Sequence, residues 1–209
     1  MVYHVINRAN NRREIFQSDS DYKMFEELLE DLVVIRDMRI IAYCIMPNHW
    51  HLILHPKTDG HLSSSMHWLT TTHSRRWLAS RKSEDGGHVY QGRYKSFLVE
   101  EDAYLLQVIR YVERNPMRAK LAIDAAAWKY SSFNSRQKKN NFLSDTIIEL
   151  PDNYTKWVND GDENVDRIRA SVNRGFPLGS DKWSLDVKDR FNLKFDVLRE
   201  IEVNKLHNE

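Results

Sequence analysis

Apolar and polar positions along the first two thirds of the chain follow two different periods. Alternation every second residue, with β-branched and aromatic side chains, is typical of strands, whereas apolar residues spaced three and four apart are typical of helices. The first period predicts strands near residues 2–8, 39–46, 49–55 and 93–100. The second period predicts helices near residues 21–37, 62–81 and 102–115.

The order of these elements is strand, helix, strand, strand, helix, strand, helix. Pro47 and Asn48 form a turn signal between two apolar strands, which indicates an antiparallel hairpin. The first six elements match the split βαβ pattern. The sequence therefore predicts an α+β protein with a ferredoxin-like, antiparallel four-stranded sheet and helices packed on it.

The last third of the chain has a different composition. It is more acidic than the first part, and Pro151 and Pro177 interrupt it. Its pattern predicts short helices near 144–150, 163–173, 183–191 and 194–205. We therefore expect one domain over residues 1–140, followed by a mostly helical C-terminal extension over residues 141–209.

The net charge is +1, but it is unevenly distributed. Residues 1–140 carry 21 Lys and Arg against 16 Asp and Glu, whereas residues 141–209 carry 10 against 14. A mildly basic first part suits a polyanionic partner without requiring one. No apolar run is long enough to cross a bilayer, and we see no signal-peptide pattern at the N-terminus. The single cysteine, Cys44, fits a reducing compartment. We expect a cytoplasmic protein with no membrane partner.

Two histidines stand two residues apart at the start of the third predicted strand. Side chains alternate between the faces of a strand, so His49 and His51 point to the same side. Two imidazoles on one rigid face can bind a divalent metal ion together. An isolated pair of this kind is more often structural, so the pair alone does not establish a metal site.

The third predicted helix carries a second set of candidates. Tyr111 and Asn115 are four residues apart, so they share a helix face and can meet one site as a nucleophile and a metal ligand. Tyr104 lies on nearly the same helix face as Tyr111 and is the alternative candidate for the nucleophile, but it has no residue with an oxygen ligand four positions later, one helical turn away. Asn115 has a simpler interpretation as the residue that ends the helix before Pro116.

Several motifs in a fixed order resemble a known family. His49-Trp50-His51 is the histidine–hydrophobe–histidine signature of HUH endonucleases. The segments at 43–51 and 111–119 resemble the single-tyrosine transposases, and among them the REP-associated tyrosine transposases of the IS200-like superfamily. Further matches are Tyr-His-Val-Ile-Asn-Arg at 3–8, Ile15-Phe16 and Tyr-Gln-Gly-Arg-Tyr-Lys-Ser-Phe at 90–97. The resemblance covers about residues 3–135.

The resemblance implies a function for these residues. His49, His51 and Asn115 correspond to the metal ligands, with Mg²⁺ or Mn²⁺ as the cofactor, and Tyr111 corresponds to the nucleophile. In that family the tyrosine attacks single-stranded DNA beside a hairpin, which gives a 5′-phosphotyrosine and a free 3′-hydroxyl. No small-molecule cofactor is implied, the protein is expected to associate with the nucleoid, and a monomer and a homodimer both remain open.

Basic residues outside this set are candidate DNA contacts. Arg93 and Lys95 share one face of the fourth predicted strand, where they either contact phosphates or form a solvated face. Arg12 and Arg13 have the same two interpretations. Two other functions remain: a single-stranded nucleic-acid-binding module without catalysis, and a metal-dependent phosphoesterase without a covalent intermediate.

Overall fold

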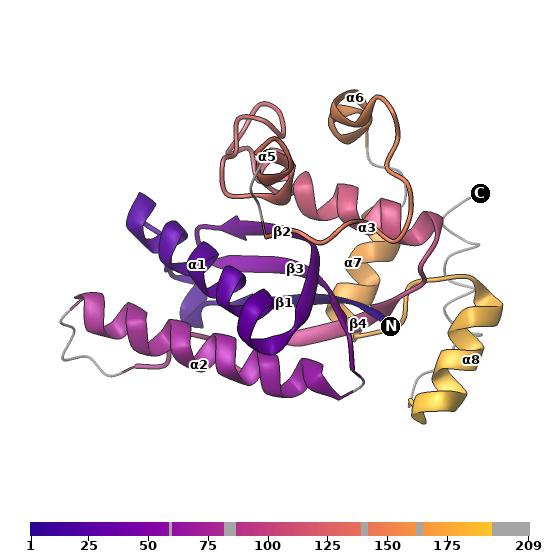
Figure 1. Cartoon of the computed structure of the whole chain (residues 1–209), viewed down its shortest axis with the longest axis horizontal. Coiled ribbons are helices and arrows are strands. Elements are labelled where there is room, and N and C mark those ends of the chain that lie inside the picture. The colour runs from indigo at the N-terminus through magenta and orange to yellow at the C-terminus, as the bar shows by residue number, and fades with distance from the viewer. Residues whose placement is uncertain (59, 82–86, 139–141, 162–164, 194–209) are drawn as a thin grey trace.

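The computed structural model describes residues 1–58, 60–81, 87–138, 142–161 and 165–193. At its centre lies one four-stranded sheet (Figure 1). Its strands are β1 (Val2–Arg8), β2 (Met38–Met46), β3 (His49–Pro56) and β4 (Lys95–Val99). They lie in the order β2-β3-β1-β4, and every pairing is antiparallel. This confirms the predicted α+β fold with its ferredoxin-like sheet.

Helices cover both faces of the sheet, which gives the molecule three layers (Figure 1). One face packs against α1 (Asp19–Arg36) and α2 (His61–Arg81). The other face packs against α3 (Ala103–Glu113) and α7 (Val165–Arg174). The remaining elements are η1 (Asn10–Arg12), α4 (Asn115–Arg118), α5 (Ser132–Arg136), α6 (Tyr154–Asn159) and α8 (Asp181–Phe191).

Alternation along β3 divides its side chains between two apolar cores. Trp50, Leu52 and Leu54 pack in the core beneath α1 and α2. Ile53 packs in the core beneath α3, on the side to which the two histidines also point. Most of the strand is therefore buried on both faces, and the partly exposed His49 lies at the end where the candidate site forms between the sheet and α3.

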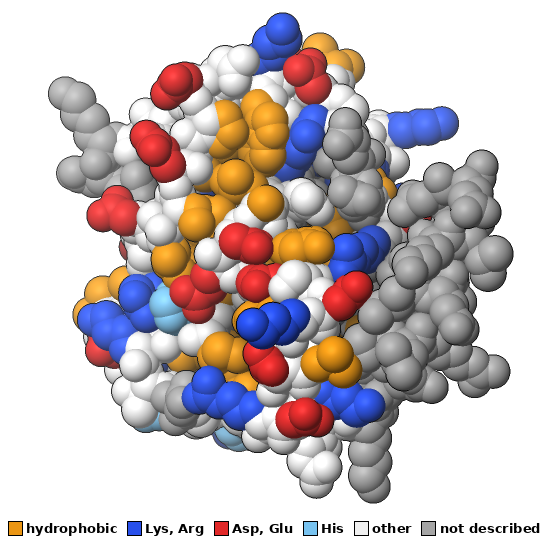
Figure 2. Space-filling model, turned by 90° about the vertical axis from the view of Figure 1, so that its right-hand side faces the viewer, with side chains coloured by type: hydrophobic (Ala, Val, Ile, Leu, Met, Phe, Trp, Pro, Cys, Tyr) orange, Lys and Arg blue, Asp and Glu red, His pale blue; other side chains and the backbone are white. Residues whose placement is uncertain are grey.

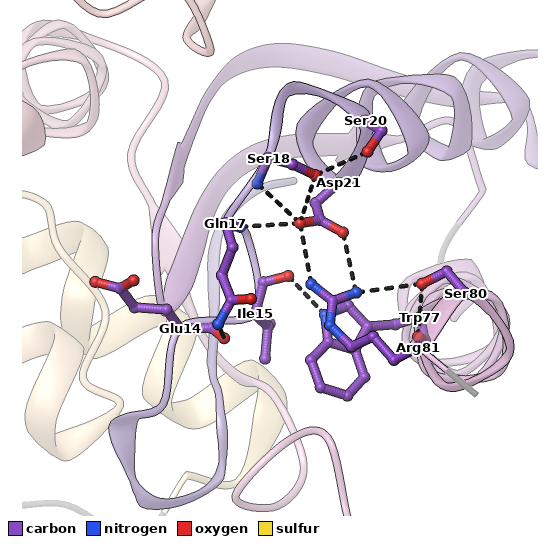
Figure 3. A network of polar contacts seen from close by, with 9 residues as sticks. All are labelled: Glu14, Ile15, Gln17, Ser18, Ser20, Asp21, Trp77, Ser80 and Arg81. Atoms are coloured by element: carbon purple, nitrogen blue, oxygen red, sulfur yellow. Dashed lines mark hydrogen bonds and ion pairs between the residues drawn. The ribbon is translucent and has the colours of Figure 1, made fainter. Parts of the chain in front are cut away.

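A buried carboxylate joins the start of α1 to the end of α2 (Figure 3). Asp21 accepts hydrogen bonds from the backbone amides of Gln17 and Ser18 at 2.9 and 3.0 Å. Arg81 donates to both carboxylate oxygens at 3.0 Å. Burial alone would raise the pKa of Asp21, but these hydrogen bonds outweigh it and lower the pKa to about 2. The contact fixes the two helices on their face of the sheet.

Three predicted elements differ from the structure. The helix predicted near 144–150 is wrong, since the amide of Ser144 donates to the carbonyl of Ile40 at 2.9 Å and the segment runs along the edge of β2 without a helix. The fourth strand begins at Lys95 instead of residue 93. The third helix ends at Glu113, and Pro116 stands in the first turn of α4.

The C-terminal extension is helical where the structure describes it. Helices α7 and α8 match the predictions near 163–173 and 183–191, whereas the helix predicted over 194–205 lies outside the described residues. Helices α5 and α6 were not predicted. Within the described residues, no helix has the length and apolarity that a membrane crossing requires.

Candidate active site

The histidine pair lies on a central strand of the sheet. His49 is opposite Arg8 of β1, and His51 is opposite Ile6. The centroids of the two imidazole rings are 5.1 Å apart, and both rings point toward α3, as the spacing of two residues requires. His51 is buried and His49 is partly exposed.

Tyr111 lies beside this pair, although 60 residues separate it from His51 in the sequence. The ring centroids of Tyr111 and His51 are 5.9 Å apart, and the rings are nearly perpendicular. Arg118 holds the tyrosine from the other side, with its guanidinium carbon 4.0 Å from the ring centroid and a hydrogen bond to the Tyr111 carbonyl. Tyr104 instead accepts a hydrogen bond from Arg167 at 3.2 Å.

These side chains line one cavity of about 260 Å³. Its wall includes all four residues that the sequence singled out, which are His49, His51, Tyr111 and Asn115. Ile6 and Arg8 of β1 complete one side. Helix α7 closes the other side with Arg169, Val172 and Asn173. Helix α7 comes from the segment after residue 140, so that segment contributes to the candidate site, while the domain division at residue 140 stays a prediction.

The hydrogen bonds of His49 determine which ring nitrogen is available. Its Nδ1 lies 2.6 Å from Oδ1 of Asn48, and Nδ2 of Asn48 donates to the carbonyl of Arg12 at 3.1 Å. The second bond orients the amide so that its oxygen faces the ring, and an amide oxygen can only accept. The proton of His49 therefore resides on Nδ1, which leaves the lone pair of Nε2 for a metal ion.

Both histidines are neutral near pH 7. Burial, followed by the charge of Arg8, lowers the pKa of His49 to about 4. Burial also lowers the pKa of His51 well below its usual value, and the charges of His4, His49, Arg118 and Arg8 add to this effect. Metal ligation requires neutral imidazole, so protons do not compete for these nitrogens at neutral pH.

Asn115 lines the same cavity as the first residue of α4, just after the end of α3. Its Nδ2 donates to the carbonyls of Tyr111 and Val112, each at 3.2 Å. These carbonyls belong to the last turn of α3, so the side chain satisfies groups that a helix end leaves unpaired. With the nitrogen directed at the helix, the amide oxygen is on the opposite side of the group. The Asn115 side chain thus caps the end of α3 through its nitrogen, and its amide oxygen is the atom that could ligate a metal ion.

The donor set fits a divalent ion with open positions. It consists of two imidazole nitrogens and one amide oxygen, and the described residues contain no cluster of three or more His, Cys, Asp and Glu side chains suited to a metal. Mixed nitrogen and oxygen ligands favour Mn²⁺ over Mg²⁺ in affinity. Three protein ligands leave room for phosphate oxygens, as a catalytic centre requires.

Arg93 and Lys95 line a second cavity of about 340 Å³ that adjoins the first. The two cavities share Ile6, Arg8, Val172 and Asn173. Arg93 precedes β4 instead of lying in it, yet both basic side chains reach the same cavity wall. Arg8, which sequence reasoning did not select, lines both cavities.

Arg12 and Arg13 line neither of these cavities as the described residues form them. Arg12 is exposed, and the guanidinium of Arg13 donates to the carbonyl of His88 at 3.0 Å and lies over the ring of Trp77. Their role in DNA binding stays a prediction.

Figure 2 shows the end of the molecule that carries α8, where Lys and Arg mix with Asp, Glu and hydrophobic side chains. The charges on that face therefore do not mark it as a DNA-binding surface.

Sequence reasoning missed one buried histidine. His4 is fully buried in β1, and its Nε2 lies 2.9 Å from Nδ1 of His51. Burial, followed by the charge of Arg118, lowers its pKa to about 3. His4 pairs directly with Ile53, so it reaches His51 as a diagonal neighbour across two strands. Only the strand register reveals this contact, although His4 belongs to one of the motifs that carry the resemblance.

The protein has an α+β fold with a ferredoxin-like sheet, and a histidine pair and a tyrosine line one cavity beside that sheet. Within this fold class, the chain belongs to the IS200-like transposases, because the family model described as "Transposase IS200 like" matches residues 1–115, more than half of the sequence. This match confirms the resemblance that the motifs indicated.

Two relatives extend the comparison. A REP-associated tyrosine transposase of Haemophilus influenzae is 25% identical over 113 residues, which are 50% of this chain and 64% of that protein. The match thus spans less than two thirds of that relative. A solved structure of a REP-associated tyrosine transposase bound to a REP hairpin has a TM-score of 0.52 and 16% identity, and the match covers 71% of this chain and 87% of that one. At 16% identity, the similarity to this solved structure establishes the fold.

Proposed function

We propose that this protein is a metal-dependent endonuclease and strand transferase that cuts single-stranded DNA beside hairpins through a 5′-phosphotyrosine on Tyr111. One observation carries the proposal. The ring of Tyr111 lies 5.9 Å from that of His51, in the cavity that His49 and Asn115 also line. The proposed nucleophile and the proposed metal donors thus converge from β3, α3 and α4, and β3 is distant in the sequence from the two helices.

Tyr111 has the central role in the proposed reaction. Its phenolic oxygen attacks phosphorus and forms a new P–O bond, and its proton passes to water. The bond from phosphorus to the 3′ oxygen breaks, and the leaving oxygen keeps the electron pair and takes up a proton. The covalent ester preserves the energy of the linkage, so a 3′-hydroxyl can attack it in reverse and reseal DNA without ATP.

His49, His51 and Asn115 would hold the divalent ion. Such an ion, when bound, stabilises the charge that develops on the phosphate oxygens. Asn48 keeps the proton of His49 on Nδ1, and Arg118 keeps the Tyr111 ring in place against the histidines. These contacts would hold His49 and Tyr111 in position before a substrate arrives, which favours catalysis.

The adjoining cavities suggest the path of the DNA strand. Arg8 lines both of them, Arg169 lines the first, and Arg93 and Lys95 line the second, so four cations border two adjoining cavities, the first of which Tyr111 also lines. Cations in this position bind phosphates without reading the sequence. The related transposase that was solved with a REP hairpin supports a DNA hairpin as the partner of this chain as well.

The two other functions fit the geometry less well. A nucleic-acid-binding module of the RNA-binding type uses an open sheet face with exposed aromatic side chains, whereas helices cover both faces of this sheet. A phosphoesterase without a covalent intermediate has no need for a tyrosine at the metal donors. The position of Tyr111 therefore favours the covalent mechanism.

Incubation with end-labelled hairpin oligonucleotides and Mn²⁺, followed by a denaturing gel, separates the three functions. We expect a covalent protein–DNA adduct together with a released fragment that ends in a 3′-hydroxyl. Free cleaved products without an adduct would favour the phosphoesterase, and binding without cleavage would favour the inactive module. Either result across a broad hairpin panel would reject the proposal.

A further inference from the structure

We propose that His4 is a positioning residue for the metal centre, because its Nε2 accepts the Nδ1 proton of His51 and so leaves Nε2 of His51 for the metal ion. The inference rests on the proposed function, since it takes His51 as a ligand. His4 itself does not touch the metal or the substrate. It acts through the ring of His51, and Asn48 has the same relation to His49.

The contact between the two rings has the geometry of an in-plane hydrogen bond. Nε2 of His4 and Nδ1 of His51 are 2.9 Å apart, the ring centroids are 5.0 Å apart, and the ring planes differ by 16°. The centroid separation exceeds the nitrogen–nitrogen distance by 2.1 Å, so the near-parallel rings are offset and meet at their edges instead of overlapping face to face. The lone pair and the N–H bond of an imidazole both lie in the ring plane, so a contact between ring edges is what this hydrogen bond needs.

The direction of this hydrogen bond decides whether His51 can be a ligand. If His4 donated to His51, the proton of the neutral His51 ring would sit on Nε2 and block the metal site. If His51 donates, its Nε2 carries the lone pair, and Nε2 of His4 must accept. In the second arrangement the proton of the neutral His4 ring lies on Nδ1, which is buried without a partner among the described residues. Metal binding at Nε2 of His51 would therefore have to offset the cost of that unpaired N–H, and it is what selects the second arrangement.

The surroundings of His4 leave it little freedom to move. Phe97 meets its ring edge-on with centroids 4.9 Å apart, and Tyr111 does so at 6.1 Å. His4 therefore contacts a proposed ligand and the proposed nucleophile at once. Burying a polar ring in an apolar core costs free energy unless the ring is hydrogen-bonded, and His4 makes its hydrogen bond to His51. The hydrogen bond to His51 explains why a histidine occupies a position where an apolar residue would pack at a lower cost in free energy.

Two substitutions separate hydrogen bonding from packing. The amide oxygen of His4→Gln can take the place of Nε2 and accept from His51, whereas His4→Met fills a similar volume without an acceptor of comparable strength. We measure the affinity of the full chain for Mn²⁺ from the EPR signal of the free ion. His4→Met should bind Mn²⁺ about 10- to 100-fold more weakly than the wild type, and His4→Gln should stay within a few-fold of it.

His73→Met is the matched control, because His73 is a buried histidine of the other core, bonded to Tyr90 at 2.7 Å. It should lose stability but keep the Mn²⁺ affinity of the wild type. Equal affinities of His4→Met and the wild type would refute the role of His4. If His49→Ala bound Mn²⁺ as tightly as the wild type, the proposed metal ligands would be refuted. The proposed function would then fail independently of the role of His4.

A measurement on the wild type avoids variants that do not fold. Long-range proton–nitrogen correlation NMR of the Zn²⁺-loaded chain reports which imidazole nitrogens carry protons. We expect a proton on Nδ1 of His51 and an unprotonated Nε2 on His4. A proton on Nε2 of His4, pointing at His51, would overturn the inference.

Discussion

Replacing Tyr111 by phenylalanine removes one oxygen atom and leaves the rest of its ring environment intact. The guanidinium of Arg118 at 4.0 Å and the ring of His51 at 5.9 Å both contact the ring, which phenylalanine retains. The contacts described for Tyr111 are made by its ring and by its backbone carbonyl, and phenylalanine keeps both. We therefore expect the free energy of unfolding to change by less than about 1 kcal/mol.

The same substitution should abolish the reaction. Loss of a covalent nucleophile lowers rates by at least about 10⁴-fold in well-studied enzymes, which corresponds to about 5 kcal/mol in activation free energy. Hairpin affinity should stay within a few-fold, because Arg8, Arg93 and Lys95 are unchanged. The barrier thus changes far more than the stability, and a general packing defect cannot produce that difference.

The assay compares cleavage rates of a labelled hairpin with urea unfolding curves of the same preparations. Tyr104→Phe is the matched control, because Tyr104 lies on the same helix but contacts Arg167 instead of the cavity. It should cleave at close to the wild-type rate. Cleavage by Tyr111→Phe within tenfold of the wild type would remove the tyrosine from the mechanism.

Three further predictions concern the metal donors, the basic cavity and the buried histidines. His49→Ala should cleave poorly even in excess Mn²⁺, because one of three donors is lost; initial rates check this, and a full rate would remove the metal site. Replacing Arg93 and Lys95 by alanine should reduce the slope of log affinity against log salt by about 1.4 on a single strand, and an unchanged slope would mean that neither side chain contacts phosphate. Burial lowers the pKa of His73 to about 3, so the folded protein keeps it neutral while the unfolded chain protonates it below about pH 6.5. The free energy of unfolding should therefore decline as pH falls from about 6.5 toward 3, by up to about 1.4 kcal/mol per pH unit from this residue. Urea titrations at pH 7.5 and 5.0 test this, and His73→Gln with an undiminished pH dependence would contradict it.

Much of the fold could be predicted because the periods in residues 2–100 are regular. The apolar stripe of α1, with Phe25, Leu28, Leu29 and Leu32 all buried, fixed one helix, and the turn at Pro47 fixed the hairpin of β2 and β3. The helix predicted near 144–150 does not form. Ile148 and Leu150 are two residues apart, which is not a helical spacing, and they pack against the core beneath α3 from a segment without regular secondary structure.

The site could be predicted only in part for a geometric reason. The spacings of His49 with His51 and of Tyr111 with Asn115 are local, so one strand and one helix determine them. The contact of His4 with His51 depends instead on the register between β1 and β3, and sequence spacing carries no information on register. The same holds for Arg169, which reaches the cavity through the packing of α7 on the sheet.

In the proposed reaction, Tyr111 becomes covalently attached to DNA. Digestion of the wild-type adduct with protease and nuclease, followed by mass spectrometry, locates the modified residue. We expect a nucleotide on Tyr111, joined through a 5′ phosphate. A nucleotide on Tyr104 or on any other side chain would contradict it.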